Sequence, residues 1–299
     1  MTVIDPSWLR RHPLPVPAQD DDKSQRGTVQ VIGGSIEVPG AVLLAGEAAL
    51  RAGAGKLRLA TVRSVAPHLA LAMPEALVIG VEETGDGAIS RHAAEVLLPR
   101  LASCAALLVG PGLSSGEEAE ALVTALLDGM EPGPGVVLDA GALSDLASHP
   151  DALRRHGLRG VVTPHAGEMA NILGIPKEEV SADPLAAARR AADVLGAVVA
   201  MKGGQTWVVA PGGEALFLDH GHVGLATSGS GDTLAGIVAG LLARGTPPLQ
   251  ATAWAVWLHA EAGHRLARRI GPLGFLAREL LAEVPAIMAD LSAGAAARP

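Results

Sequence analysis

The fold of this chain is constrained most by an alternation, from residue 28 onward, of short apolar runs with longer segments rich in alanine and leucine. The runs are nearly all apolar, as strands covered on both faces are, and they lie at residues 29–32, 57–61, 76–79, 106–109, 136–138, 160–163 and 198–201. Helix-forming segments with apolar residues three and four positions apart lie between them, at 41–52, 88–102, 117–130 and 184–195. The alternation predicts an α/β fold with a mostly parallel central sheet and helices on both faces.

The pattern changes after Lys202. Two short runs, at 206–210 and 215–218, flank a Pro-Gly-Gly turn and predict a C-terminal β-hairpin. Three helices are expected to follow it, at 231–243, 249–270 and 276–291. With no clear linker and no internal repeat, we expect one domain over residues 28–293, a lead-in at 1–27 and a tail at 294–299.

Composition and charge exclude several classes of protein. With 299 residues, 49% of them hydrophobic, the chain can bury a large core and is not a disordered protein. A net charge of −8 without a basic run argues against nucleic-acid binding, and two Phe, four Trp and no Tyr leave few rings for base stacking.

The single cysteine, Cys104, has apolar neighbours, which indicates a buried thiol in a reducing compartment. No secretory signal and no apolar run long enough for a membrane span is visible in the sequence. We therefore expect a cytoplasmic protein with no membrane partner.

Glycine-rich or polar clusters follow five of the predicted strands. Ligands of open α/β sheets bind beyond the carboxyl ends of the strands, where these clusters would lie. One such cluster is ordinary turn chemistry, but five together predict a large polar cleft lined by backbone. The clusters are Gly33-Gly34-Ser35, Gly110-Pro111-Gly112, Asp139-Ala140-Gly141, Thr163-Pro164-His165 and Lys202-Gly203-Gly204.

The segment 226–236, ATSGSGDTLAG, carries small residues directly into an apolar helix. Backbone N–H groups from Gly229 to Asp232 would be free at the N-terminus of that helix, where the helix dipole favours a phosphate. Asp232 is the only acid in the segment, and it could take the proton from a hydroxyl that attacks a bound phosphoryl group. The alternative is a simple capping role for Asp232 on a buried helix.

Other nucleotide motifs fail. Gly55-Lys56 looks like the end of a Walker A loop, but Leu50 stands at the required first glycine and Leu57 replaces the Ser or Thr. No G-x-G-x-x-G follows the first strand, so a Rossmann dinucleotide site is unsupported.

The histidines predict no metal site. His259 and His264 are five residues apart, whereas zinc helices use positions i and i+4, so we interpret both as ordinary helix residues. After the strand at 160–163, Thr163 is expected to cap a helix. His165 is then left at the mouth of the cleft, where it could bind a ligand.

These motifs resemble, over about residues 26–292, those of the ADP-dependent (6S)-NAD(P)H-hydrate dehydratases, a family of the ribokinase-like superfamily. The motif Gly229-Ser230-Gly231-Asp232 alone would indicate only a ribokinase-like kinase, but the GGS…PGA and TPHAGE elements narrow the resemblance to the dehydratases. The motifs that carry it are Val31-Ile32-Gly33-Gly34-Ser35 with Pro39-Gly40-Ala41, the run AALRAGAG at 48–55, Pro74-Glu75, Gly110-Pro111-Gly112-Leu113, Leu138-Asp139-Ala140-Gly141-Ala142-Leu143, TPHAGE at 163–168, Lys202-Gly203-Gly204-Gln205-Thr206 and Gly229-Ser230-Gly231-Asp232.

The resemblance implies repair of nicotinamide cofactors that have gained water across a ring double bond. ADP, or ATP in some branches, would phosphorylate the hydroxyl with Mg²⁺ present, and elimination of phosphate would return NADH or NADPH. Asp232 would be the catalytic base and would also contact the hydrate. Ala41, Gly112 and His165 would line the hydrate site, while Lys202, Gly203, Gly204, Gln205, Thr206, Gly229, Ser230 and Gly231 would bind the nucleotide. Homotetramers and a partner epimerase, often fused to the dehydratase, are also family expectations.

The chain departs from the family pattern at four places. Arg26-Gly27 replaces Lys-Gly, Val38 stands near a usual Tyr or Phe, and Gly141 replaces the second acid of DADAL. An asparagine usual before the GxGD motif is absent, and Gly221-His222 stand there. Two alternatives remain: a ribokinase-like kinase of a small alcohol such as a vitamin precursor, and a nucleotide-binding sensor without catalysis.

Overall fold

A central sheet organises the molecule. The computed structural model describes residues 2–16, 18, 20, 22–144, 146, 148–156 and 159–296. Within them ten strands lie in the order β1 (Thr2–Val3), β10 (Ala215–Leu218), β9 (Thr206–Val209), β8 (Val198–Met201), β7 (Gly160–Val162), β6 (Gly135–Leu138), β5 (Ala106–Val109), β2 (Thr28–Ile32), β3 (Lys56–Val62) and β4 (Ala76–Val81). Neighbouring strands are parallel except where β9 pairs with β8 and β10, which confirms the mostly parallel sheet and the hairpin.

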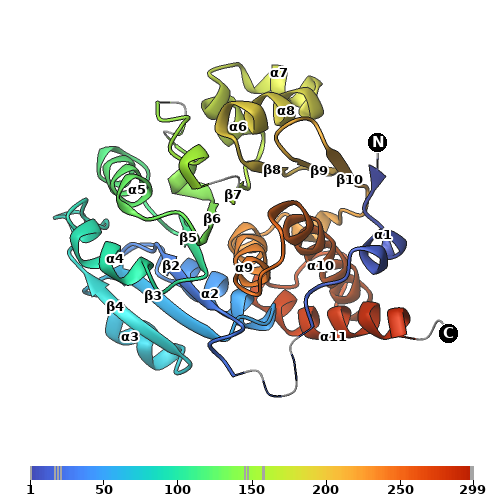
Figure 1. Ribbon diagram of the computed structural model, residues 1–299, viewed down its shortest axis with the longest axis horizontal. Helices are drawn as coiled ribbons and strands as arrows, with labels where there is room; N and C mark the ends of the chain where they lie inside the picture. The colour runs from blue at the N-terminus through green and yellow to red at the C-terminus, as the bar shows by residue number, and fades with distance from the viewer. Residues whose placement is uncertain are drawn as a thin grey trace.

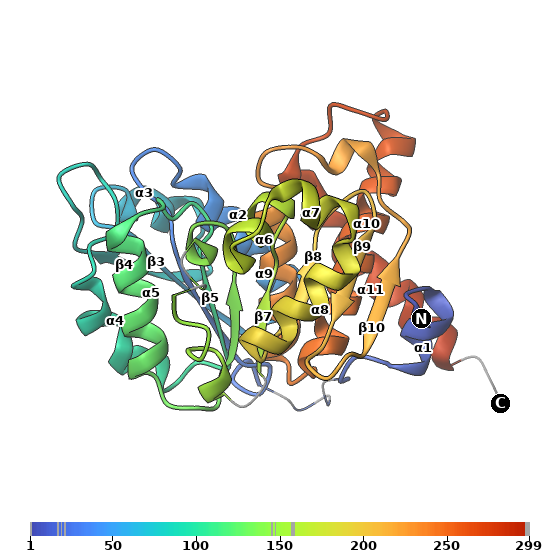
Figure 2. The same ribbon diagram turned by 90° about the horizontal axis from the view of Figure 1, so that it is seen from above.

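Helices cover both faces of the sheet (Figures 1 and 2). One face carries α1 (Pro6–Arg11), α2 (Gly40–Arg51), α3 (Ala66–Ala72), α9 (Ser230–Ala243), α10 (Pro248–Arg269) and α11 (Ala277–Ala296). The other carries α4 (Ala93–Leu101), α5 (Glu117–Gly129), α6 (Ala166–Leu173), α7 (Lys177–Ala182) and α8 (Pro184–Leu195). Short 3₁₀ turns lie at η1 (Ala140–Leu143), η2 (Arg154–His156) and η3 (Val223–Leu225).

Each inner strand contributes side chains to two hydrophobic cores, one on each face of the sheet. The strands are therefore apolar throughout. In β3, Leu57 and Leu59 enter the core under α2 and α9, whereas Ala60 and Val62 enter the opposite core. Alternate residues of a strand point to opposite faces, so a strand covered on both sides keeps no polar face.

Chain order reverses between β2 and β5. From β2 the chain runs outward through β3 to β4, then returns to β5 on the other side of β2 and continues through β6, β7 and β8. A crevice forms at such a reversal, and it is where ligands of open α/β sheets bind.

The described part of residues 1–27, which were expected as a lead-in, carries structure of its own. Strand β1 extends the sheet beside β10, and Ile4, Trp8 and Leu9 are buried against the helical layer. The indole of Trp254 in α10 donates a hydrogen bond to the carbonyl of His12 (2.7 Å).

Other boundaries shift by a few residues. Helix α4 begins at Ala93 rather than near 88, because Glu83 bridges Ile89 and the Thr84 hydroxyl accepts from the N–H of Ala88 in a turn. Helix α11 continues through the start of the expected tail to Ala296, and residues 297–299 lie outside the described part.

Cys104 is buried, as its apolar neighbours predict. Among the described residues, none of the helices combines the length and apolarity that crossing a bilayer requires.

Candidate active site

The loops after β2 and β5 interlock at the reversal of chain order. The N–H of Gly34 donates to the carbonyl of Pro111 (2.7 Å), and a Cβ on Gly33 would lie 2.1 Å from that same oxygen. A Cβ on Gly112 would lie 2.9 Å from the Cβ of Ala41, at the start of α2. The fold therefore brings Ala41 and Gly112 together, as expected, and the close approach of the two loops requires glycine.

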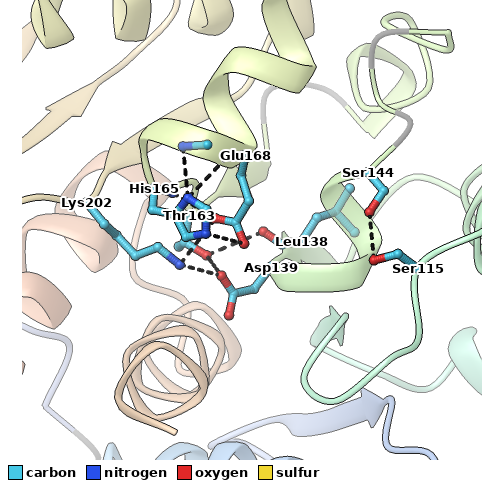
Figure 3. Close-up of polar contacts among 9 residues, drawn as sticks. Ser115, Leu138, Asp139, Ser144, Thr163, His165, Glu168 and Lys202 are labelled. Atoms are coloured by element: carbon cyan, nitrogen blue, oxygen red, sulfur yellow. Dashed lines mark hydrogen bonds and ion pairs between the residues drawn. The ribbon is translucent and has the colours of Figure 1, made fainter. Parts of the chain in front are cut away.

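Three side chains from strand ends and one from α6 form a buried polar cluster (Figure 3). Asp139 follows β6 and is only 1% exposed. Its Oδ1 accepts from the Thr163 hydroxyl (2.6 Å) and from the Lys202 ammonium (2.9 Å). The same ammonium lies 3.7 Å from Glu168 of α6. Burial disfavours the charged form of Lys202, but the charges of Asp139 and Glu168 outweigh it and raise the pKa of the ammonium.

His165, not Thr163, caps α6, which corrects the expectation from the sequence. Its Nδ1 accepts from the N–H groups of Gly167 (3.0 Å) and Glu168 (3.1 Å), and the Glu168 carboxylate accepts from the N–H of His165. Thr163 is fully buried and donates to Asp139 instead. Because backbone N–H groups occupy Nδ1, neutral His165 carries its proton on Nε2, which lies 3.6 Å from Glu168.

The N-terminus of α9 has the backbone N–H groups that the predicted anion nest requires. Gly229 is its N-cap in the left-handed region (φ 85°), and no side chain caps the helix. The N–H groups of Gly231 and Asp232 meet no acceptor among the described residues. A Cβ on Gly231 would lie 3.5 Å from Lys202 Nζ and 3.8 Å from Asp139 Oδ2. The nest thus faces the buried polar cluster.

Asp232 is not a helix cap, so the simpler interpretation of this residue is wrong. Its carboxylate accepts no hydrogen bond from the described part of the chain. Burial and the nearby charge of Asp139 raise its pKa to about 7, while Lys202 opposes that shift. A carboxylate with this pKa is suited to take and return a proton near neutral pH.

A cavity of about 790 Å³ opens beside the nest. That volume is in the range of cofactor and substrate sites. Of the predicted binding residues, those that line it are His165, Lys202, Gly203, Gly204, Thr206, Ser230 and Gly231.

Five predicted site residues lie outside the cavity lining. The Gln205 amide donates to Asp219 (3.2 Å) instead, and the Cα of Gly229 faces Leu44 and Ala277. Ala41 and Gly112 form their own contact at the reversal of chain order, and Asp232 lies within electrostatic reach of Asp139 and Lys202.

Three residues of the site have no role assigned by the sequence motifs alone. Asp139 and Glu168 complete the polar cluster with Lys202, and His259 pairs its Nε2 with the Ser230 hydroxyl (2.9 Å) in the cavity wall. Burial lowers the pKa of His259 to about 4, and Lys202 adds to the effect. An acid directly after an apolar strand could have identified Asp139. Spacing could not identify His259, because its partner is 29 residues away.

A steric constraint explains why glycine stands at position 141, where the family resemblance expects a second acid. A Cβ there would lie 2.3 Å from the carbonyl oxygen of Leu113. Ala140 before it adopts a positive φ of 46°, which is unusual for a residue with a side chain. This backbone path admits only glycine at 141, so the single acid of the loop is Asp139.

Similarity to known proteins shows the family of this chain. The profile of a family described as NAD(P)H-hydrate dehydratase matches residues 29–286. An ADP-dependent (S)-NAD(P)H-hydrate dehydratase of Xanthomonas campestris pv. campestris is 51% identical over 98% of both chains. Several bifunctional NAD(P)H-hydrate repair enzymes also match, and the chain spans about half of their length.

Two solved structures share the fold. The ADP/ATP-dependent NAD(P)H-hydrate dehydratase of Bacillus subtilis, co-crystallised with ATP and Mg²⁺, superimposes with a TM-score of 0.82 at 30% identity, covering 97% of this chain and 98% of the other. A ribokinase-like superfamily protein of Enterococcus faecalis reaches 0.85 at 27% identity, covering 98% and 96%. These matches confirm the predicted ribokinase-like α/β fold.

Proposed function

The chain belongs to the NAD(P)H-hydrate dehydratase family, and from this we propose that it repairs hydrated nicotinamide cofactors with an adenine nucleotide as phosphoryl donor. The substrate is (6S)-NADHX or NADPHX, and with ADP the products are NADH or NADPH, AMP and phosphate. The observation that carries the proposal is the place of Asp232, a carboxylate with a pKa of about 7 at the edge of a phosphate-sized nest of free N–H groups.

The nucleotide occupies the 790 Å³ cavity. Its phosphates lie over the free N–H groups of Gly231 and Asp232, where the dipole of α9 and the Lys202 ammonium both favour negative charge. The loop from Lys202 to Thr206, together with Gly229 and Ser230, holds the rest of the nucleotide.

Mg²⁺ fits this arrangement. The ion usually takes one or two protein carboxylates and completes its shell with water and substrate phosphates. Asp139 Oδ2 accepts no hydrogen bond from the described residues and faces the nest, and Glu168 lies on the other side of Lys202. Asp139 would hold Mg²⁺ through Oδ2, and the ion when bound would neutralise charge on the phosphates, while Glu168 stays engaged by the His165 N–H and Lys202. The described residues contain no group of three or more His, Cys, Asp or Glu side chains that could hold a metal by itself.

Asp232 starts the reaction by taking the proton of the ring hydroxyl. The oxygen attacks the terminal phosphorus of ADP, a P–O bond forms, and the bond from that phosphorus to AMP breaks. Hydroxide is a poor leaving group, but the phosphate ester leaves readily when the ring nitrogen donates its lone pair. Loss of a proton from the neighbouring ring carbon then restores the double bond.

The hydrate is held beside Asp232 by Ala41, Gly112 and His165, and His165 also lines the nucleotide cavity, so the two ligands meet there. Ala41 and Gly112 present a close-packed surface of small residues at the reversal of chain order. His165 contributes a donor from Nε2, because its Nδ1 is engaged by the N-terminus of α6. The ring hydroxyl would thus lie between its base and the donor phosphate.

An isotope experiment tests the phosphoryl-transfer step. Hydrated NADH labelled with ¹⁸O in its hydroxyl is turned over with ADP, and inorganic phosphate is analysed by mass spectrometry. We expect one ¹⁸O in each phosphate, because the hydroxyl oxygen leaves bonded to phosphorus. Label that appears in water would exclude phosphorylation of the hydroxyl, and a phosphate ester that accumulates would indicate a kinase that releases its product.

Family resemblance supports further proposals about partners and setting. The bifunctional relatives support a functional partnership with an epimerase that supplies the 6S epimer to this chain. We also propose a single catalytic domain, a homotetramer and a cytoplasmic enzyme. Mass measurement of the purified protein and fractionation of cells test the last two.

A further inference from the structure

Three histidines and two other rings form a continuous column beside the cavity. His220 stacks on Trp257 of α10 (ring centroids 4.9 Å) and on His264 (4.1 Å), and its Nε2 lies 3.0 Å from Glu261. His264 meets His222 edge to face at 5.1 Å. Phe275 lies on the other side of His222, at 6.2 Å. The chain has only 2% aromatic residues, and this column of packed rings holds the His222 ring in place.

The backbone fixes the proton of His222. Its Nδ1 accepts from the N–H of Gly224 (3.1 Å) at the start of η3. A backbone N–H can only donate, so neutral His222 carries its proton on Nε2. No described residue accepts from Nε2, and the side chain lines the cavity. His222 therefore offers one rigidly held donor to whatever fills that part of the cavity.

The surroundings of His222 suit a nucleobase better than a phosphate. Apolar side chains line the cavity there and include Leu218, Val223, Leu225, Val256 and Ala260. Residue 221 packs on the nucleotide loop, since a Cβ on Gly221 would lie 2.3 Å from the carbonyl of Gly204. The phosphates are already accounted for by the nest at Gly231 and by Lys202.

We propose that His222 is a specificity-determining residue of the nucleotide cavity, which donates a hydrogen bond from Nε2 to a ring nitrogen of a purine base. A purine has unprotonated ring nitrogens at its edge and apolar faces for the aliphatic lining. The inference rests on the proposed function only in taking the cavity to hold a nucleotide.

Binding measurements with altered bases test the proposal. The affinities of ADP and of its 1-deaza, 3-deaza and 7-deaza analogues are measured by calorimetry with the wild type and with His222→Asn. Asparagine keeps an acceptor for the Gly224 N–H, but its shorter side chain does not place its amide N–H donors at the position of Nε2. We expect the variant to bind ADP about fivefold to tenfold more weakly. One deaza analogue should lose a similar factor with the wild type and nothing further with the variant.

Two controls keep the outcome clear. His68→Asn changes an exposed histidine outside the cavity lining and should bind ADP as the wild type does. His222→Ala removes the cap as well, so comparison of the melting temperatures of the two His222 variants separates the cap from the contact. If His222→Asn binds ADP and all three analogues as the wild type does, the proposal is wrong. Binding requires no turnover, so a wild type that discriminates among the analogues but does not dehydrate NADHX would overturn the proposed function alone.

Discussion

At the residue scale, the surroundings of Asp232 determine how basic its carboxylate is. Its carboxylate is partly buried, accepts no hydrogen bond from the described residues and lies near the charge of Asp139. Each of these disfavours the ionised form, and only Lys202 opposes them. An ordinary aspartate would be a much weaker base at neutral pH, so the site gains basicity at the expense of local stability.

Replacement of that base should abolish turnover and spare nucleotide binding. Asp232→Asn keeps the volume of the side chain and the N–H groups of the nest, so ADP should still bind. Turnover should fall by roughly 10²- to 10⁴-fold, the usual contribution of a general base. Steady-state kinetics with parallel calorimetry measures both. Near wild-type turnover would show that Asp232 is not the base.

The pH profile of kcat/KM should follow the titration of Asp232 and should shift when Asp139 is replaced. The base works deprotonated, so kcat/KM should rise with pH to a plateau above a pKa of about 7. Asp139→Asn removes a neighbouring negative charge and should move that limb to lower pH, while burial keeps it above the ordinary value of aspartate. Comparison of the two proteins cancels titration of the nucleotide. An unmoved limb would mean that a different group titrates.

Stability should change in the opposite sense to activity. The pKa of Asp232 is higher in the folded chain than its ordinary value of 3.8, so folding favours the neutral form. The resulting destabilisation is absent below pH 3.8, grows between pH 4 and 7 and is complete above about 7. Asp232→Asn should therefore raise the melting temperature at pH 8 more than at pH 5. Scanning calorimetry at the two pH values measures the difference, and equal shifts would contradict the raised pKa.

At the element scale, the close contact between α2 and α9 fixes the nest. A Cβ on Gly236 would lie 2.2 Å from the carbonyl of Ala45, and one on Gly240 would lie 2.4 Å from that of Ala49. Two backbones can approach this closely only where glycine stands on one of them. Helix α9 is thereby held against the helix that begins at the loop after β2.

Separation of the two helices should therefore destabilise the fold. Gly236→Ala forces the backbones apart and should cost about 1–3 kcal/mol in the free energy of unfolding, by the usual scale of overpacking. Gly40→Ala is the matched control, because Gly40 lies at the start of α2 and has open space around it. Denaturant unfolding compares the two, and equal stabilities would show that the contact is not tight.

Elements were more predictable from the sequence than their contacts. Buried strands such as 106–109 follow from apolar runs, because both faces are covered. The cap of α6 could not be predicted in this way, because Thr163 and His165 are both able to cap a helix. The Thr163 hydroxyl donates to the buried Asp139, so His165 caps α6 instead. The start of α4 depends on a local turn held by Thr84, which helical periodicity does not report.

At the whole-molecule scale, the N-terminal helix α1 packs against the C-terminal helices. Figure 1 shows α1 beside α10 and α11, and β1 adds the outermost strand next to β10. Family motifs predicted the nest, the Lys202 loop and the small residues at the reversal of chain order. They did not predict that residues 2–12 complete the core, since that segment carries no motif and too few residues for a periodicity.

The N-terminal segment should contribute to stability without contributing to catalysis. Trp8 is 5% exposed and packs in the core with Leu9, so Trp8→Ala should cost about 3–5 kcal/mol in the free energy of unfolding. Val16→Ala, at a residue 86% exposed, should cost almost nothing. Where Trp8→Ala remains folded, its KM values should match those of the wild type. Altered KM values with unchanged stability would place the segment in the site instead.

The most direct test of nucleotide-dependent dehydration is absorbance at 340 nm with purified protein, chemically hydrated NADH and Mg²⁺, and with ADP or ATP supplied in turn. We expect absorbance to rise only when a nucleotide is present, the amount of NADH formed to equal the amount of nucleotide cleaved, and Asp232→Asn to show no comparable rise. A protein that binds nucleotide yet gives no rise with either donor would contradict the proposed function.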